Sequence, residues 1–239
     1  GAVDNSVRVD VQNASSAALN SVYGGYAKGA NAGAVSGNTV TFSRGATLHD
    51  LMGGYIDSAT STSDVSGNKV FVEGGTVDNA TTAPSDLRIY GGYTKGTGTA
   101  AQNVLHITGG TIGSDTMPAH EVDVIGGRSE KGAAKGNHVV VDQPFATVEG
   151  SVTGGYGATA TDNTVEILAG TLTGSVYGGY ATTAGTPATT GASPTAEVSA
   201  LRNNKVTLRD GVTVTGNVYG GYAAADASNM TSATDSNTI

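Results

Sequence analysis

Residues 163–180 read NTVEILAGTLTGSVYGGY, and variants of this unit recur along nearly the whole chain of 239 residues. Every copy begins at an asparagine, and these residues are Asn5, Asn38, Asn68, Asn103, Asn137, Asn163, Asn204 and Asn237. The copies from Asn5 to Asn204 each carry a Gly-Gly doublet, and all ten tyrosines of the chain flank these doublets. Self-similarity of this kind indicates a repeat protein, in which each unit packs on the next.

The apolar residues of the unit alternate with polar ones, as Val165 and Ile167 do. Alternation with period two places such side chains on one face of a strand, and no stretch shows helical periodicity. Three short runs, around 165–167, 171–173 and 176–177, are separated by turn residues. The chain is therefore predicted to be all-β: a parallel β-helix (β-solenoid) of about seven coils, each with three short strands and a variable edge loop.

Residues 1–239 are expected to form a single β-helix fragment. Because Asn5 and Asn237 each start a copy close to an end of the chain, we expect the fragment to be cut from a longer array. The connections between each doublet and the next asparagine vary in length, and the longest covers 181–203. They are expected to emerge along one edge of the rod.

Stacking of the copies places equivalent residues in columns. The asparagines should form one column, in which each side-chain amide hydrogen-bonds to the next amide and to turn backbone. The Gly-Gly doublets are followed by neither a helix nor a Lys-Ser/Thr pair, which argues against a phosphate-binding loop. They are expected to supply unusual backbone conformations at a tight corner.

A second column follows the doublets and consists of Tyr26, Tyr55, Tyr93, Arg128, Tyr156, Tyr180 and Tyr222. Two interpretations stay open for it: a ladder of tyrosines stacked on one another, or a surface that stacks on sugar rings. Arg128 is expected to lie between Tyr93 and Tyr156 and to be reachable by solvent.

A third column contains Asp50, Arg88 and Asp123 on consecutive strands. Arg88 is expected to approach one or both aspartates. Exposed ion pairs contribute only about 0–1 kcal/mol, so these pairs would mark the register of the strands rather than a functional site.

Charged residues also gather in the third and fourth copies and their insertions. The candidate contact residues are Asp78, Asp86, Asp115, His120 and Glu121. They could assemble a carboxylate or metal site, or simply belong to polar surface loops. No spacing typical of metal ligands occurs, so no metal, cofactor or catalytic residue is assigned.

The composition excludes several classes of protein. The formal net charge is −8, and the chain lacks the clusters of Lys and Arg that nucleic-acid binding requires. No stretch approaches the roughly 18 apolar residues of a transmembrane helix, so this segment is not expected to be embedded in a membrane. The absence of cysteine excludes disulfides and thiolate metal sites.

The pattern Asn-x-Val-x-Ile followed by Val-Tyr-Gly-Gly-Tyr resembles the passenger regions of large autotransporter (type V secreted) adhesins of Gram-negative bacteria, over nearly the whole chain. The resemblance implies a right-handed parallel β-helix at the bacterial cell surface, with the full protein anchored in the outer membrane. It implies adhesion or autoaggregation, with a host or bacterial surface protein, a glycan or a second copy of the chain as partner. The catalytic motifs of some family members match no residues of this chain.

Two alternatives stay open beside a non-enzymatic adhesive segment. A polysaccharide lyase or hydrolase with a β-helix fold would need carboxylates about 5–9.5 Å apart in one cleft. Convergence of Asp78, Asp115, Glu121 and Asp123 would provide them. A passive structural stalk would need no ligand.

Overall fold

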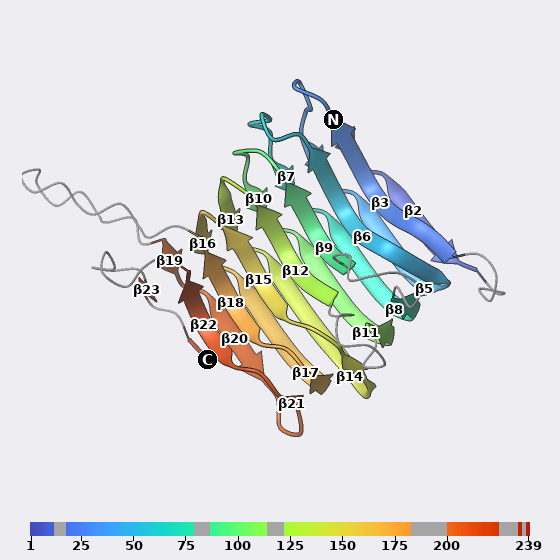
Figure 1. Ribbon diagram of the computed structural model, residues 1–239, viewed down its shortest axis with the longest axis vertical. Helices are drawn as coiled ribbons and strands as arrows, with labels where there is room; N and C mark the ends of the chain where they lie inside the picture. The colour runs from blue at the N-terminus through green and yellow to red at the C-terminus, as the bar shows by residue number, and fades with distance from the viewer. Residues whose placement is uncertain (12–17, 79–86, 114–121, 183–199, 225–233, 236–237) are drawn as a thin grey trace, which may run out of the picture.

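The computed structural model describes residues 1–11, 18–78, 87–113, 122–182, 200–224, 234–235 and 238–239. All regular secondary structure in these residues is β-strand, and every strand pairing is parallel. Figure 1 shows the strands side by side in chain order, from the N-terminal to the C-terminal repeats.

Each repeat contributes three strands, here called the first, second and third strand in chain order. The first strands are β1 (Ala2–Val3), β4 (Val35–Ser36), β7 (Val65–Ser66), β10 (Ala100–Ala101), β13 (Ala133–Lys135), β16 (Thr159–Thr161), β19 (Leu201–Arg202) and β23 (Thr234–Asp235). The second strands are β2 (Ser6–Asp10), β5 (Thr39–Arg44), β8 (Lys69–Val77), β11 (Val104–Ile112), β14 (His138–Val148), β17 (Thr164–Leu172) and β20 (Lys205–Leu208), which β21 (Thr213–Val214) continues. The third strands are β3 (Ala18–Lys28), β6 (Ala46–Asp57), β9 (Leu87–Thr94), β12 (Val122–Ser129), β15 (Val152–Gly157), β18 (Val176–Ala181) and β22 (Val218–Ala223).

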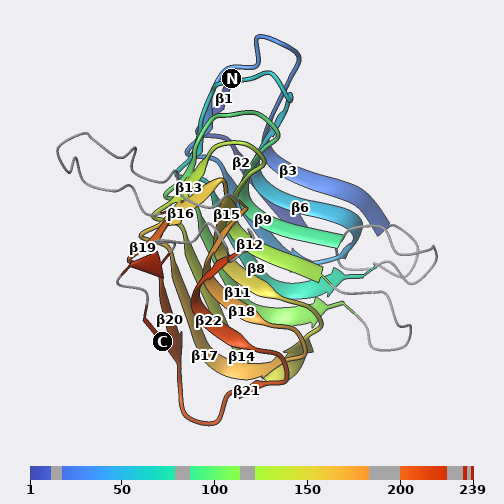
Figure 2. The ribbon, with the colours of Figure 1, turned by 60° about the vertical axis from the view of Figure 1, so that its left-hand side comes forward.

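Corresponding strands of successive repeats are neighbours. Val165 of β17, for example, pairs with Val139 of β14 on one side and with Val206 of β20 on the other. The first strands form an eight-stranded sheet, while the second and third strands belong to one fifteen-stranded sheet. The third strands all end toward the same edge, so the variable connections that follow them leave from one edge, as predicted (Figures 1 and 2).

The strand boundaries differ from the predicted ones in two respects. The runs expected at 165–167 and 171–173 belong to a single strand, β17, because the backbone passes through Gly170 with a φ of 112° and the pairing resumes with a shifted register. A bulge of this kind bends a strand without ending it. The remaining strand of the repeat is the short first strand, which lies inside the connection expected to be a loop. Its two or three residues are too few for an alternation to reveal.

The core is built by the inward residues of the second and third strands. Val165 and Ile167 of β17 and Val176 of β18 are fully buried, and equivalent residues of the other repeats join the same cluster. Each such side chain contributes about 1.5–3 kcal/mol on burial, before entropy costs. The first strands add a smaller cluster that includes Val35 and Val65.

The asparagine column lies at the corner between the first and second strands. From Asn38 to Asn204, each Oδ1 accepts hydrogen bonds from the backbone N and the Nδ2 of the preceding asparagine, with Nδ2–Oδ1 distances of 2.7–3.0 Å. Each Nδ2 from Asn38 onward also donates to a backbone oxygen of the preceding repeat's first strand, and these asparagines are at most 1% exposed. Asn237 lies outside the described residues.

The Gly-Gly doublets allow neighbouring backbone and asparagine side chains to approach closely. The expectation that they supply unusual backbone conformations was wrong. None of the glycines in the seven doublets at 24–25, 53–54, 91–92, 126–127, 154–155, 178–179 and 220–221 has a positive φ, whereas Gly75 and Gly110 of two other Gly-Gly pairs do. A Cβ atom on Gly53 would lie 2.5 Å from the carbonyl oxygen of Gly91, and one on Gly92 would lie 2.6 Å from Oδ1 of Asn103. The doublets therefore make room for the next repeat and for the asparagine column.

The left-handed conformation occurs instead at the residue before each described column asparagine. φ is 67° at Gly37 and 62° at Gly67, but it is also 54° at Gln102 and 60° at Asp162. A side chain in this conformation costs about 1–2 kcal/mol. This corner thus requires a positive φ, which is met by glycine at Gly37, Gly67 and Gly136 and by other residues in the remaining described copies.

Replacing Asn103 by Ala should destabilise the chain by about 3–5 kcal/mol, because it leaves the buried amide of Asn68 and the oxygens of Val65 and Asn137 without this partner. The exposed Asn5 is the matched control, and Asn5→Ala should cost about 1 kcal/mol. Chemical denaturation measures both. Equal losses at the two positions would contradict the role of burial in the column.

Replacing Gly92 by Ala should cost about 3 kcal/mol or more, because the new methyl group meets Asn103 in a packed interior. Gly67→Ala is the comparison: its Cβ would meet no atom closer than 3.9 Å, so only the positive φ opposes it, at about 1–2 kcal/mol. The same denaturation measurement separates the two. If Gly67→Ala were the more damaging change, close packing at the doublets would not explain them.

Candidate binding face

The outward side chains of the third strands form one aligned set, here called the outer face, in which Met52 and Tyr90 are fully buried and Ile125 is 4% exposed. Because Leu51, Ile89 and Val124 point into the core, their neighbours on each strand point outward. The outer face has four columns. The first is Ser21, Asp50, Arg88, Asp123, Ser151, Ser175 and Asn217; the second is Tyr23, Met52, Tyr90, Ile125, Thr153, Tyr177 and Tyr219; the third is the column of Tyr26 to Tyr222 with Arg128; the fourth is Lys28, Asp57, Lys95 and Glu130 in the N-terminal repeats and Thr182 and Ala224 in the C-terminal ones.

Asp57 is the centre of a cluster on β3, β6 and the end of β9. The hydroxyls of Tyr26 and Tyr55 donate to its two carboxylate oxygens at 2.9 and 3.1 Å. Lys95 donates from Nζ at 2.8 Å, and Lys28 lies 3.8 Å away. The hydrogen bond from Lys95, supported by those from the two tyrosines, lowers the pKa of Asp57 to about 2.

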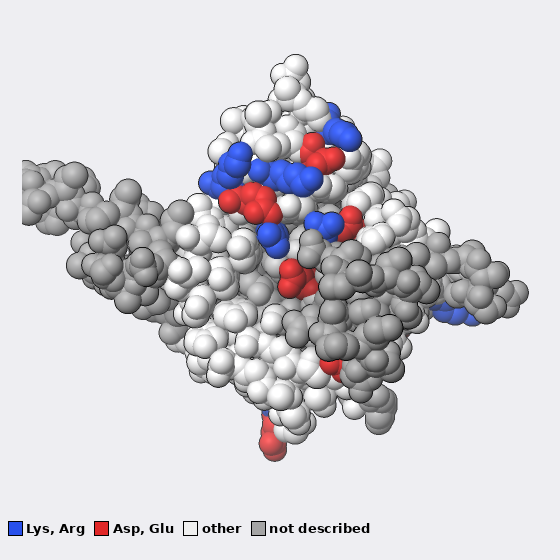
Figure 3. All heavy atoms as spheres, viewed as in Figure 1, with Lys and Arg blue, Asp and Glu red and all other residues white. Residues whose placement is uncertain are grey.

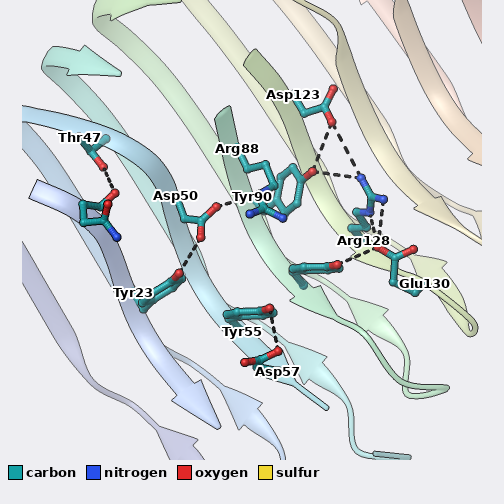
Figure 4. Close-up of polar contacts among 12 residues, drawn as sticks. Tyr23, Thr47, Asp50, Tyr55, Asp57, Arg88, Tyr90, Asp123, Arg128 and Glu130 are labelled. Atoms are coloured by element: carbon teal, nitrogen blue, oxygen red, sulfur yellow. Dashed lines mark hydrogen bonds and ion pairs between the residues drawn. The ribbon is translucent and has the colours of Figure 1, made fainter. Parts of the chain in front are cut away.

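Arg88 pairs with Asp50 as predicted, with Nε 2.8 Å from Oδ1. Tyr23 donates its hydroxyl to the other oxygen of Asp50 at 2.6 Å (Figure 4). The pair was expected to be exposed, but the side chains are only 28% and 9% accessible. Burial removes water that would otherwise compete for both groups, so this contact is more than a marker of register.

Arg128 lies between Tyr93 and Tyr156, as predicted. Its guanidinium carbon is 5.6 and 4.6 Å from the two ring centroids, a geometry that permits cation–π attraction. Nη2 is 2.9 Å from Oε1 of Glu130, and Nη1 donates to the hydroxyl of Tyr90 at 3.1 Å (Figure 4). The side chain is 22% accessible, so it is reachable by solvent and also paired.

The phenols of this charged region act as hydrogen-bond donors. Tyr55 and Tyr93 are 7% and 4% exposed, and Tyr93 donates to Glu130 at 2.8 Å. Burial, reinforced by the neighbouring carboxylate, raises the pKa of each phenol well above its ordinary value. Both hydroxyls therefore keep their protons at physiological pH, and each neutral phenol holds a carboxylate in place.

The tyrosines of β15, β18 and β22 stack on one another. The ring centroids of Tyr156 and Tyr180 are 4.8 Å apart with planes 18° apart, and those of Tyr177 and Tyr219 are 5.2 Å apart at 7°. Tyr222 lies 5.1 Å beyond Tyr180. Both faces of the Tyr180 ring thus meet another tyrosine. This geometry supports the stacked ladder, and at Tyr180 it leaves the ring edge and hydroxyl, not the ring faces, for a ligand.

The outer face has two halves that differ in charge. Figure 3 shows Lys, Arg, Asp and Glu gathered in the upper part of the view, over β3, β6, β9 and β12. The outward positions of β15, β18 and β22 hold Ser, Thr, Asn, Ala and Tyr. We call these the charged half and the neutral half.

Of the predicted contact residues, Asp78 is the one that the structure describes. Asp78 follows β8, is partly buried, and donates its backbone N to the oxygen of Thr47 at 3.2 Å. Asp86, Asp115, His120 and Glu121 lie outside the described residues. Within the described ranges, no group of three or more His, Cys, Asp or Glu side chains could hold a metal ion.

The sequence interpretation missed Asp57, and it grouped Glu130 with the charges of the third and fourth copies without predicting its partners. Each accepts hydrogen bonds or ion pairs from several neighbours. A signal was available: Lys28, Asp57, Lys95 and Glu130 alternate in charge at the same position of four successive copies. Alternation on adjacent strands indicates cross-strand pairs.

The described residues contain no helix with the length and hydrophobicity needed to cross a bilayer. Comparison with protein-family models, with curated proteins and with solved structures finds no match to this chain.

Replacing Asp57 by Asn should lower the free energy of unfolding by about 1–2 kcal/mol at pH 7. The lowered pKa of Asp57 means that its carboxylate stabilises the fold above about pH 4, and that this contribution is lost as the pH falls toward 2. The difference between the parent chain and the variant should therefore shrink over that window, as measured by denaturation at several pH values. Lys95→Met should remove part of the same pH dependence, and a difference that stays constant down to pH 2 would contradict this assignment.

Proposed function

We propose that this chain is a stretch of right-handed parallel β-helix from the surface-exposed passenger region of a Gram-negative autotransporter adhesin, and that it acts in adhesion or autoaggregation through its outer face. The partner is a protein or glycan of a host or bacterial surface, or a second copy of the chain. The chain itself is proposed to have no enzymatic role.

The pairing of corresponding strands supports the β-helix. Each described repeat places its asparagine within hydrogen-bonding distance of the next, although the two can be 26 residues apart, as at Asn137 and Asn163, or 41 apart, as at Asn163 and Asn204. A winding chain with a constant cross-section and variable loops meets this requirement directly. Insertions at one edge leave the pairing unchanged.

The outer face is the observation that carries the proposed adhesive role. Seven third strands in register align four columns of mostly polar and aromatic side chains, and the tyrosines of β15, β18 and β22 are all at least partly exposed. In the charged half, Arg88 is paired with Asp50, which also accepts a hydrogen bond from Tyr23, and Arg128 is paired with Glu130 and donates to Tyr90. A face that is already ordered loses little side-chain entropy when it binds a partner, which favours contact over a large area.

The test uses the absence of cysteine from the chain. Asn217→Cys introduces a single thiol on the outer face, and Thr108→Cys introduces one on the outward side of β11. Asn217 and Thr108 are both exposed. Beads coated with the unmodified chain should clump or attach to an epithelial layer more than beads coated with serum albumin. Coupling a bulky polyethylene glycol maleimide to the thiol of the Asn217→Cys variant should suppress this binding several-fold.

The same coupling to the Thr108→Cys variant is the matched control and should leave bead attachment and clumping within twofold of the unmodified chain. Coated beads that neither clump nor attach would contradict the adhesive role. Equal suppression by the two modifications would contradict the outer face as the site of contact.

A further inference from the structure

The phenol hydroxyls of the two halves differ in their bonding. In the charged half, the hydroxyls of Tyr23, Tyr26, Tyr55 and Tyr93 all donate to carboxylates. In the neutral half, the hydroxyls of Tyr156, Tyr177, Tyr180, Tyr219 and Tyr222 make no hydrogen bond to any described residue. Along the same columns, the tyrosine hydroxyls are therefore bound to carboxylates in the charged half and available as donors and acceptors in the neutral half.

The columns beside these tyrosines become uncharged at the same point. The first column changes from Asp50, Arg88 and Asp123 to Ser151, Ser175 and Asn217, and the fourth changes from Lys95 and Glu130 to Thr182 and Ala224. A face without charge offers nothing to an ionic partner, which would lose its hydration without compensation. The complementary partner is uncharged and rich in hydroxyl groups.

The available hydroxyls are held in a regular row. Tyr180 is fixed between Tyr156 and Tyr222, with centroid separations of 4.8 and 5.1 Å, and Tyr177 is stacked on Tyr219 at 5.2 Å. Rings packed in this way have little rotamer freedom to lose on binding. The row repeats at the spacing of the strands, so it suits a regular polymer laid along the rod better than a single small molecule.

We infer that the neutral half binds a neutral polysaccharide, through hydrogen bonds to the phenol hydroxyls and to the Ser and Asn side chains of the first column. This inference rests on the proposed function, since it assigns a ligand class to part of the same outer face. Recognition does not involve stacking on ring faces, because neighbouring tyrosines already cover both faces of Tyr180. Because each hydroxyl adds a similar contact, affinity rises with the length of the oligosaccharide.

The experiment is an array of neutral and acidic oligosaccharides, from two to eight sugar residues long, probed with the purified chain. Retention is expected on neutral oligosaccharides and should increase with length. The double variant Tyr177→Phe/Tyr180→Phe removes two hydroxyls and keeps the stacked rings, so it should fold with an unchanged circular dichroism spectrum. Its affinity for the neutral oligosaccharide that the parent chain binds best should fall about tenfold.

The matched control is Tyr26→Phe, because the hydroxyl of Tyr26 is already bound to Asp57 in the charged half. This variant should change affinity less than twofold. Three results would overturn the inference: no retention on any neutral oligosaccharide, retention on acidic ones alone, or equal affinity of the double variant. A double variant that alters only self-association, measured by sedimentation, would also overturn it in favour of a second copy as the occupant.

The bead assay keeps this inference separate from the proposed function. If beads attach normally with the double variant and no oligosaccharide is retained, the adhesive role stands and the polysaccharide site does not. If the parent chain binds neutral oligosaccharides but its beads neither clump nor attach, the polysaccharide site stands and the adhesive role does not.

Discussion

The hydrogen bonds between successive buried asparagines are the constraint on which the rest of the structure depends. Each of these amides must find its partner in the next repeat, because an unsatisfied polar group in this position costs about 1–3 kcal/mol. The requirement determines the register of every repeat at one corner. It also explains the Gly-Gly doublets, since a Cβ on Gly92 would occupy the space of the Asn103 amide. The recurring asparagines and the Gly-Gly doublets therefore depend on each other, because the asparagine amides pack directly against the doublets.

The outer face follows from the same register. Because the asparagine column aligns the repeats, Tyr55, Tyr93 and Tyr156 occupy equivalent places, and Arg128 enters their column between two aromatic rings. Variation in the outward residues then changes the chemistry of the face without changing its geometry. In the neutral half, Ser and Asn replace the carboxylates of the first column, and Thr and Ala replace those of the fourth, so the phenols there are available instead of bound.

How far the sequence predicts the structure depends on how many residues carry each signal. The parallel all-β class and the asparagine column were readable because each recurs in several copies, and the Arg88–Asp50 pair was readable because that repetition aligns equivalent positions of neighbouring copies. The first strands were not, since a pair such as Val35–Ser36 is too short to show alternation. The role of the doublets was misread because a Gly can serve either a positive φ or a close approach, and only the neighbouring atoms distinguish the two. The burial of Arg88 and Asp50 depends on side chains from other repeats, which no local pattern describes.

The direction of the hydrogen bonds between repeats has a mechanical consequence. Strand-to-strand bonds and the asparagine bonds both run from one repeat to the next, along the stack and across the strands. A pull along the stack would load the bonds of one interface together, while bonds elsewhere in the chain stay intact. Under tension the chain would therefore release repeats singly from an end, each rupture freeing one repeat's length of polypeptide and leaving the remaining stack in register.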